Sequence, residues 1–283
     1  MRLINTDSMK MEEFFGTQVP RYIILSHTWG ADEISFQDYI EGYKKIYDFA
    51  HLAKMLRRRA DKSLRDPVKH IWIDTCCINK ESSAELSEAI NSMYAWYRQA
   101  HTCIALLSDV EIPVPGLRVL SDVLENWIGE SRWFTRGWTL QELIAPRSVT
   151  FYDKEWKQIT ERYESAREIS AITGIEPKIL AGEWDLSRMT VAQRMSWAAR
   201  RETTRAEDIA YCLLGIFGVN MPLLYGEGDN AFHRLQQEIL KSTSDQSIFA
   251  WGLDEPLSDE PVSRRNSMLA RHPRSFERCG HLE

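Results

Sequence analysis

The sequence predicts an α/β fold, in which a mostly parallel sheet flanked by helices is followed by a helical extension. Two observations predict it. Short apolar runs alternate with amphipathic stretches in the first part of the chain, and strand signals fade after about Trp156. Strands that alternate with helices are typical of a parallel sheet covered on both faces.

Four apolar runs are predicted strands, at 22–26, 71–74, 102–107 and 149–152. The clearest predicted helix covers 83–100, because its apolar residues recur at i, i+4, i+7 and i+11. This stripe consists of Leu86, Ile90, Met93 and Tyr97. Ser82 followed by Glu85 predicts a capping box at the start of that helix.

After Trp156 the sequence favours helices, at 163–173, 190–201, 205–217 and 230–241. These patterns predict three parts. An α/β domain covers 1–155, and a helical extension packed on it covers 156–253. Residues 254–283 are predicted to be a loosely ordered tail or the start of a missing region, because they are rich in Pro, Ser, Arg and charge.

Composition narrows the classes of function. The net charge of −6 argues against broad nucleic-acid binding, and the basic run 54–62 is interpreted as a solvated helix face. The chain shows no signal-peptide pattern and no apolar window long enough to span a membrane. Five cysteines, two of them adjacent, do not resemble a disulfide framework. We therefore expect a cytoplasmic protein with no membrane span.

Three segments resemble the signature blocks of the fungal heterokaryon-incompatibility (HET) family. They read YIILSHTWG at 22–30, IWIDTCCIN at 71–79 and GWTLQELIAP at 137–146. This resemblance covers about residues 1–155. Three later segments, at 194–198, 207–215 and 224–228, are similar to the region that commonly follows this domain in fungi.

The resemblance implies a role and a set of partners. HET domains are the effector ends of fungal self/non-self recognition, and they trigger programmed cell death when a sensing module clusters them. It therefore implies self-association on activation, together with an upstream sensor module or partner protein. No such sensor is visible in the 283 residues.

The order of elements is also similar to that of Toll/interleukin receptor (TIR) domains, which implies a TIR/flavodoxin-like sheet. The block SRWFTRGWTLQEL at 131–143 carries the Ser, Trp and Glu of the corresponding TIR segment, here Ser131, Trp138 and Glu142. In TIR domains that hydrolyse NAD, that glutamate is catalytic. The resemblance thus implies Glu142 as the catalytic residue and NAD as a substrate. The loop 109–130 is longer than that of a TIR domain.

NAD hydrolysis is chemically reasonable at these residues. Nicotinamide leaves without protonation, so one carboxylate that stabilises the oxocarbenium-like transition state suffices. Trp138 lies four residues before Glu142, and its indole can stack on a pyridinium ring. Trp133 can do the same, and Arg132 or Arg136 can meet the pyrophosphate. The alternative is that Glu142 is a solvated residue or a salt-bridge partner.

Polar residues follow two predicted strands, where ligands bind in open α/β sheets. Ser26, His27 and Trp29 follow one strand and Asp74 follows another, so all four are candidate substrate contacts. Alternatively, Ser26 and His27 hydrogen-bond their own loop, and Asp74 caps the next turn.

The sequence contains no motif that predicts a metal site or a bound cofactor. Cys76 and Cys77 are interpreted as structural, because adjacent cysteines ligate one zinc poorly and no helix start lowers their pKa. The sequence contains neither a phosphate-loop nor a dinucleotide-binding glycine pattern, so no cofactor is predicted. Two hypotheses remain: a clustered enzyme that hydrolyses NAD or a related nucleotide, and a non-enzymatic, self-associating module that recruits a partner.

Overall fold

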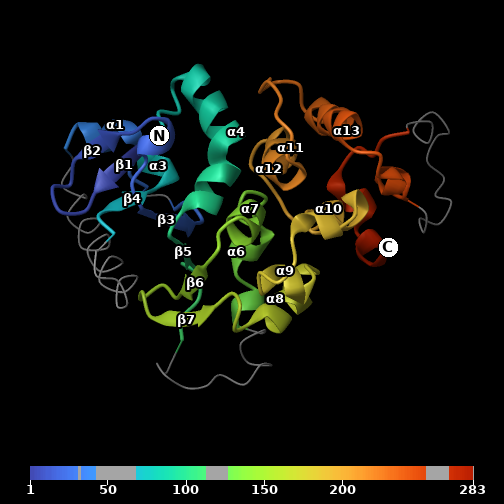
Figure 1. Cartoon of the computed structure of the whole chain (residues 1–283), viewed down its shortest axis with the longest axis horizontal. Helices are drawn as coiled ribbons and strands as arrows, with labels where there is room; N and C mark the ends of the chain where they lie inside the picture. The colour runs from blue at the N-terminus through green and yellow to red at the C-terminus, as the bar shows by residue number, and fades with distance from the viewer. Residues whose placement is uncertain (31–32, 43–67, 113–126, 253–267, 283) are drawn as a thin grey trace. The chain divides into compact units, whose positions relative to one another are not determined.

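The computed structural model describes residues 1–30, 33–42, 68–112, 127–252 and 268–282. The chain divides into two compact units (Figure 1). Unit 1 consists of Met1–Arg118 and Ala145–Arg162, and unit 2 of Val119–Ile144 and Tyr163–Glu283.

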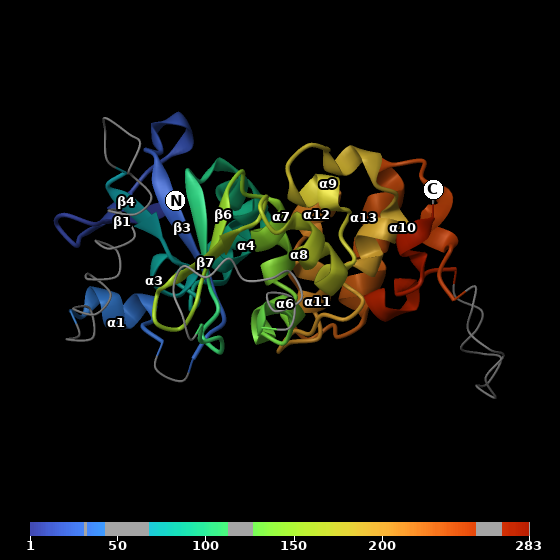
Figure 2. The ribbon, with the colours of Figure 1, turned by 90° about the horizontal axis from the view of Figure 1, so that it is seen from below.

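Unit 1 contains the sheet, whose described strands run in the order β2-β1-β4-β3-β5-β6-β7. They are β1 (Arg2–Asn5), β2 (Met11–Glu13), β3 (Tyr22–His27), β4 (His70–Trp72), β5 (Thr102–Leu106), β6 (Val149–Tyr152) and β7 (Gln158–Glu161). The four predicted strands are β3 to β6, which are mutually parallel, so the mostly parallel α/β fold is confirmed. Figure 2 shows β3, β5 and β6 side by side.

The four parallel strands follow a doubly wound order. The strand β4 lies on one side of β3, and β5 and then β6 lie on the other side. In the register, Leu25 pairs with Ile104 and His27 with Leu106. Strand order therefore reverses between β3 and β5, and ligands bind at the carboxyl edge of such a switch point.

Antiparallel strands complete both edges of the sheet, and the sequence did not predict them. The strand β2 has three residues, and β7 pairs with β6 through a register shift at Phe151 and Tyr152. These strands are short and carry mixed polarity, so they show no apolar run of their own.

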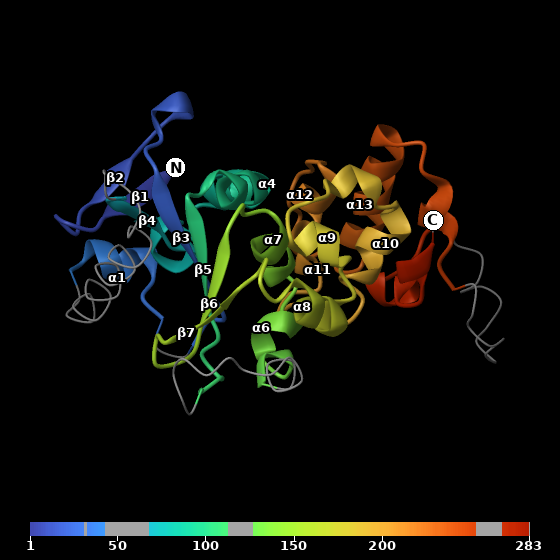
Figure 3. The same ribbon diagram turned by 60° about the horizontal axis from the view of Figure 1, so that its bottom comes forward.

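The predicted long helix is α4 (Ser83–Gln99), which buries Ile90, Met93 and Tyr97 of the predicted stripe. The Tyr97 ring packs edge-on against Trp72, with 5.8 Å between ring centroids (Figure 3 shows α4 above the strands). Unit 1 also contains α1 (Phe36–Ile40) and α3 (Asp74–Cys77).

The predicted capping box of α4 is half formed. The Ser82 side chain accepts a hydrogen bond from the Glu85 N–H, as expected. The Glu85 carboxylate instead accepts from the Arg2 guanidinium, at 2.5 and 2.8 Å, and from the Asn79 N–H. A charged donor from β1 is the stronger partner, so it replaces the local one.

Unit 2 is helical in its described residues. Its α-helices are α6 (Arg132–Thr135), α7 (Thr139–Ile144), α8 (Ala166–Thr173), α9 (Pro177–Leu180), α10 (Val191–Ser196), α11 (Asp208–Tyr211), α12 (Leu214–Phe217) and α13 (Asn230–Ser242). They confirm the predicted helical character of 163–241, although the stretch predicted as one helix at 205–217 contains both α11 and α12. Phe232, Leu235 and Ile239 on α13 are buried in the unit 2 core.

The division differs from the predicted boundary at 155, because residues 131–144 belong to unit 2. The Gly137 N–H donates to the Glu202 carbonyl at 2.8 Å, and the Glu202 N–H donates to the Thr135 carbonyl at 2.7 Å. A Cβ atom at Gly137 would lie 2.5 Å from Thr203 Cγ2, so this close approach requires glycine. Pairing with a segment some 65 residues away leaves no local sequence signal.

The described part of the predicted loose tail packs against α10. Residues 268–282 include η5 (Pro273–Phe276) and η6 (Cys279–His281), and Phe276 is fully buried. The Thr190 hydroxyl also donates to the Leu282 carbonyl at 3.3 Å. Composition averaged over the tail hid these few apolar residues.

Two further interpretations of the sequence concern the basic run and membrane-spanning helices. The basic run 54–62 lies outside the described residues. Among the residues that are described, no helix is long and apolar enough to cross a bilayer.

Candidate functional site

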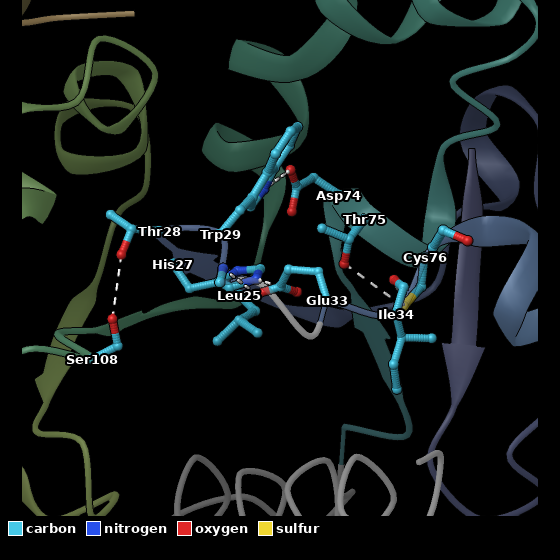
Figure 4. A network of polar contacts seen from close by, with 12 residues as sticks. Leu25, His27, Thr28, Trp29, Glu33, Ile34, Asp74, Thr75, Cys76 and Ser108 are labelled. Atoms are coloured by element: carbon cyan, nitrogen blue, oxygen red, sulfur yellow. Dashed lines mark hydrogen bonds and ion pairs between the residues drawn. The ribbon is translucent and has the colours of Figure 1, made fainter. Parts of the chain in front are cut away.

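The switch point of unit 1 carries a cluster of polar and aromatic side chains, which we call the carboxyl-edge cluster (Figure 4). It consists of His27, Thr28, Trp29, Glu33, Asp74, Lys80 and Ser108. The residues after β3 meet those after β4 and β5 because parallel strands end at one edge of the sheet.

His27 and Glu33 form an imidazole–carboxylate pair, with His27 Nε2 3.1 Å from Glu33 Oε2. Burial raises the pKa of Glu33, but several contacts outweigh it and leave that pKa below its ordinary value. These are the hydrogen bond and charge of His27, the Gly30 N–H and the Lys80 ammonium. The arrangement therefore favours an ionised carboxylate next to an imidazole that can transfer protons.

Trp29 presents an indole that is 49% exposed, and both its edge and its face are engaged. Its Nε1 donates to Asp74 Oδ2 at 2.8 Å. The Lys80 ammonium lies 3.4 Å from the ring centroid and 3.9 Å from Asp74 Oδ2. Burial lowers the pKa of Lys80, against the opposing charges of Asp74 and Glu33. The indole face thus already binds a cation.

The remaining strand-end residues have structural contacts in unit 1. Ser26 is buried within β3, and Asp74 opens the short helix α3 while it holds the Trp29 indole. Cys76 and Cys77 lie on α3, which the sequence did not predict as a helix. Burial nevertheless raises the pKa of Cys76 to about 12 and raises that of Cys77 further. Protonated, buried thiols fit the structural interpretation.

The second group of predicted site residues lies in unit 2, at α6 and α7. Ser131 caps α6, since its hydroxyl accepts from the Trp133 N–H at 3.3 Å. Trp133 is fully buried and packs edge-on against Phe134, so its ring presents no open face for a ligand. Arg132 is exposed to solvent.

Glu142 lies on α7 and is 8% exposed, near the buried guanidinium of Arg201. Arg201 donates to the Arg136 carbonyl at 2.8 Å and to the Thr139 hydroxyl at 2.9 Å. Burial lowers the pKa of Arg201 to about 10, while the negative charge of Glu142 opposes that shift. The sequence left open a catalytic Glu142 and, as the alternative, a solvated residue or a salt-bridge partner. Its burial close to a cation argues against a solvated residue, and the other two interpretations stay open.

Trp138 precedes α7 and hydrogen-bonds the Asp208 carboxylate, which also accepts from the Tyr225 hydroxyl at 2.9 Å. Burial raises the pKa of Asp208, and these two hydrogen bonds oppose the shift. Glu207, the preceding residue, accepts from the N–H groups of Gly226 and Gly228 at 2.7 and 3.0 Å. Within unit 2, hydrogen bonds therefore join Trp138 of the first motif to the motifs at 207–215 and 224–228.

The predicted site residues consequently fall into two groups, each described in its own unit. Ser26, His27, Trp29 and Asp74 belong to unit 1, and Ser131, Arg132, Trp133, Trp138 and Glu142 to unit 2. Sequence reasoning missed Glu33, Lys80, Thr28 and Ser108. The hydroxyls of Thr28 and Ser108 lie 3.3 Å apart, and Ser108 follows a predicted strand, which was the available signal.

Residues 22–114 match the family described as "Heterokaryon incompatibility protein (HET)". The chain is a HET-domain protein. Its HET domain contains the whole carboxyl-edge cluster, whereas the block 131–143 lies outside the matched residues. Residues 230–283 match a second family, described as "Domain of unknown function (DUF8212)".

The HET-domain chain is 45% identical over 230 residues to "Vegetative incompatibility protein HET-E-1" of Podospora anserina. The match covers 79% of this chain and 16% of that relative, so the chain spans a small part of the relative's length. No solved structure matches the chain. The similarity to TIR domains therefore stays a prediction.

Proposed function

We propose that this HET-domain chain is a cytoplasmic cell-death effector in fungal heterokaryon incompatibility, and that it hydrolyses NAD when clustered. The family match and the relative named as a vegetative incompatibility protein support the biological process. An upstream sensor or partner protein would bring copies together, and self-association would activate them.

One observation carries the enzymatic part of the proposal. The exposed Trp29 indole holds a cation 3.4 Å from its ring centroid at the carboxyl edge of a doubly wound sheet. A nicotinamide ring of NAD is a flat cation of the kind that such an indole binds. Displacement of the Lys80 ammonium by the ring would leave Lys80 close to Asp74.

The proposed reaction breaks the bond between the ribose carbon and the nicotinamide nitrogen. The electron pair leaves on nicotinamide, which becomes neutral, and water adds to the ribose carbon and loses a proton. His27, paired with Glu33, is a suitable acceptor for that proton. The products are nicotinamide and ADP-ribose.

Two carboxylates are candidates for stabilising the oxocarbenium-like transition state. Glu142 is the candidate from the TIR resemblance, and Glu33 is the candidate from the carboxyl-edge cluster. A negative charge close to the ribose serves this role, whichever carboxylate supplies it.

The test is nicotinamide release by purified protein with NAD, before and after forced clustering. Glu142→Gln and Glu33→Gln are compared with Glu88→Gln, an exposed substitution on α4. We expect clustering to start release, Glu88→Gln to preserve it, and one of the two candidate substitutions to abolish it. No release from demonstrably clustered protein would reject NAD hydrolysis.

A non-enzymatic, self-associating signalling module is the second candidate function. The observation that favours it is that Trp133 is fully buried and Trp138 is hydrogen-bonded to Asp208, which are structural roles. In unit 1, Phe15 and Ile40 are 67% and 63% exposed and are available for contacts with a partner. In that case clustered Glu142→Gln and Glu33→Gln proteins would still signal.

A further inference from the structure

The amino edge of the sheet in unit 1 contains a second feature, a hollow of about 620 Å³. We call it the amino-edge hollow and define it by Arg21, Arg98, His101 and Arg147, which line it. Arg21 directly precedes β3, His101 directly precedes β5 and Arg147 lies just before β6. These positions are at the opposite ends of the strands from the carboxyl-edge cluster.

The hollow concentrates positive charge in an acidic protein. Its lining contains three arginines and no carboxylate, although the chain as a whole carries a net charge of −6. Within the described part of the chain, none of the three arginines forms an ion pair with a carboxylate. Arg21 Nη2 lies 3.1 Å from His101 Nδ1, so two basic side chains are also held together.

The fold explains only one of these charges. Arg98 lies in the last turn of α4, where a cation interacts favourably with the helix dipole. Arg21 and Arg147 belong to other elements, and the dipole of α4 does not account for their approach. Guanidinium groups stay charged at every physiological pH, so an anion bound in the hollow would relieve their mutual repulsion.

We propose that the amino-edge hollow binds a small molecule that carries two or more adjacent phosphates. Guanidinium forks bind phosphate oxygens in pairs, and three forks from three elements match a pyrophosphate or a longer chain. A volume of about 620 Å³ is typical of a small-molecule site and exceeds the needs of a single phosphate. A single-stranded nucleic acid would need a longer basic track with stacking aromatics, and no aromatic ring other than His101 lines the hollow.

The test is calorimetric titration of the full chain with inorganic phosphate, tripolyphosphate, ATP and a short oligouridine. We expect saturable binding of one tripolyphosphate per chain, at least about tenfold tighter than inorganic phosphate because more guanidinium contacts form. If ATP binds more tightly than tripolyphosphate, the ligand of the hollow is a nucleotide. If ATP binds equally or more weakly, the ligand is an inorganic polyphosphate. Oligouridine that binds more tightly than both would overturn the proposal.

Substitutions of the lining arginines test whether tripolyphosphate binds in the amino-edge hollow. Arg98→Gln combined with Arg147→Gln should weaken tripolyphosphate binding by at least about tenfold, since two charged hydrogen-bond donors are lost. Arg167→Gln, an exposed arginine on α8 in unit 2, is the matched control and should bind as the parent does. If the double variant does not fold, each single variant should still bind more weakly. Unchanged binding in folded variants, or no binding by the parent, would overturn the proposal.

Discussion

The indole N–H of Trp29 donates to the Asp74 carboxylate at 2.8 Å, which joins the loop after β3 to the first turn of α3. This hydrogen bond fixes an exposed aromatic ring at the carboxyl edge of the sheet. The same carboxylate lies 3.9 Å from the Lys80 ammonium that covers the ring. Asp74 therefore positions both the aromatic face and the cation on it.

Asp74→Ala should lower the free energy of unfolding by about 1 kcal/mol, because a charge-assisted hydrogen bond at a partly exposed site is lost. Asp74→Asn retains an acceptor for the indole and should recover part of that loss. Urea denaturation followed by tryptophan fluorescence measures both. An alanine variant as stable as the parent would show that the Trp29 contact contributes nothing to stability.

The His27–Glu33 pair predicts a pH dependence with a defined sign. The pKa of Glu33 is lowered in the folded protein, so its stabilising effect is present above the ordinary glutamate pKa of about 4.3 and is lost as pH falls through the folded value. Glu33→Gln should therefore lower the melting temperature near neutral pH and make little difference in acid. A difference between parent and variant that grows in acid would contradict this assignment.

Arg201→Ala should destabilise unit 2 by about 3 kcal/mol, because the Arg136 carbonyl and the buried Thr139 hydroxyl each lose the Arg201 donor and Glu142 loses a nearby cation. Its neighbour Arg200 is the matched control, since its side chain is 81% exposed and forms a surface ion pair with Glu277. Arg200→Ala should cost less than about 1 kcal/mol. Chemical denaturation measures the free energy of unfolding of both variants. Equal losses of stability in the two variants would refute the structural role assigned to Arg201.

Gly137→Ala should destabilise the protein by about 2 kcal/mol, because the new methyl group would lie 2.5 Å from Thr203 Cγ2. Thr203→Ser removes that methyl group and keeps a hydroxyl for the Arg205 carbonyl. The double variant should therefore be more stable than Gly137→Ala alone, as measured by thermal denaturation. Failure of the serine substitution to restore stability would show that Thr203 is not the main obstacle.

The parts of the fold that the sequence predicted correctly are those with a strong local pattern. The strands β3, β5 and β6 are continuous apolar runs, and α4 has a regular apolar stripe. The edge strands depend on pairing with a neighbour and carry no such pattern. The division into two units depends on the same kind of long-range pairing, since 131–144 joins unit 2 and pairs with Glu202.

In the candidate site, too, the residues that follow predicted strands could be found from the sequence, whereas those from irregular segments could not. Trp29 and Asp74 are both candidate substrate contacts because each follows a parallel strand, and the Trp29 indole donates to Asp74 in the structure. Their role as substrate contacts stays a prediction. Glu33 and Lys80 reach the cluster from irregular segments, whose paths no periodicity encodes. The role of Glu142 stays a prediction, since its placement in the sequence does not determine its chemistry.

The two margins of the sheet restrict how copies of this chain can assemble. A strand of three residues at one margin and a register shift at the other leave few free backbone groups in line for a neighbouring chain. Growth by adding strand to strand, the usual route to uncontrolled fibres, is thereby discouraged. For the cell-death effector proposed above, this restriction makes assembly depend on side-chain surfaces that a sensor can bring together or keep apart.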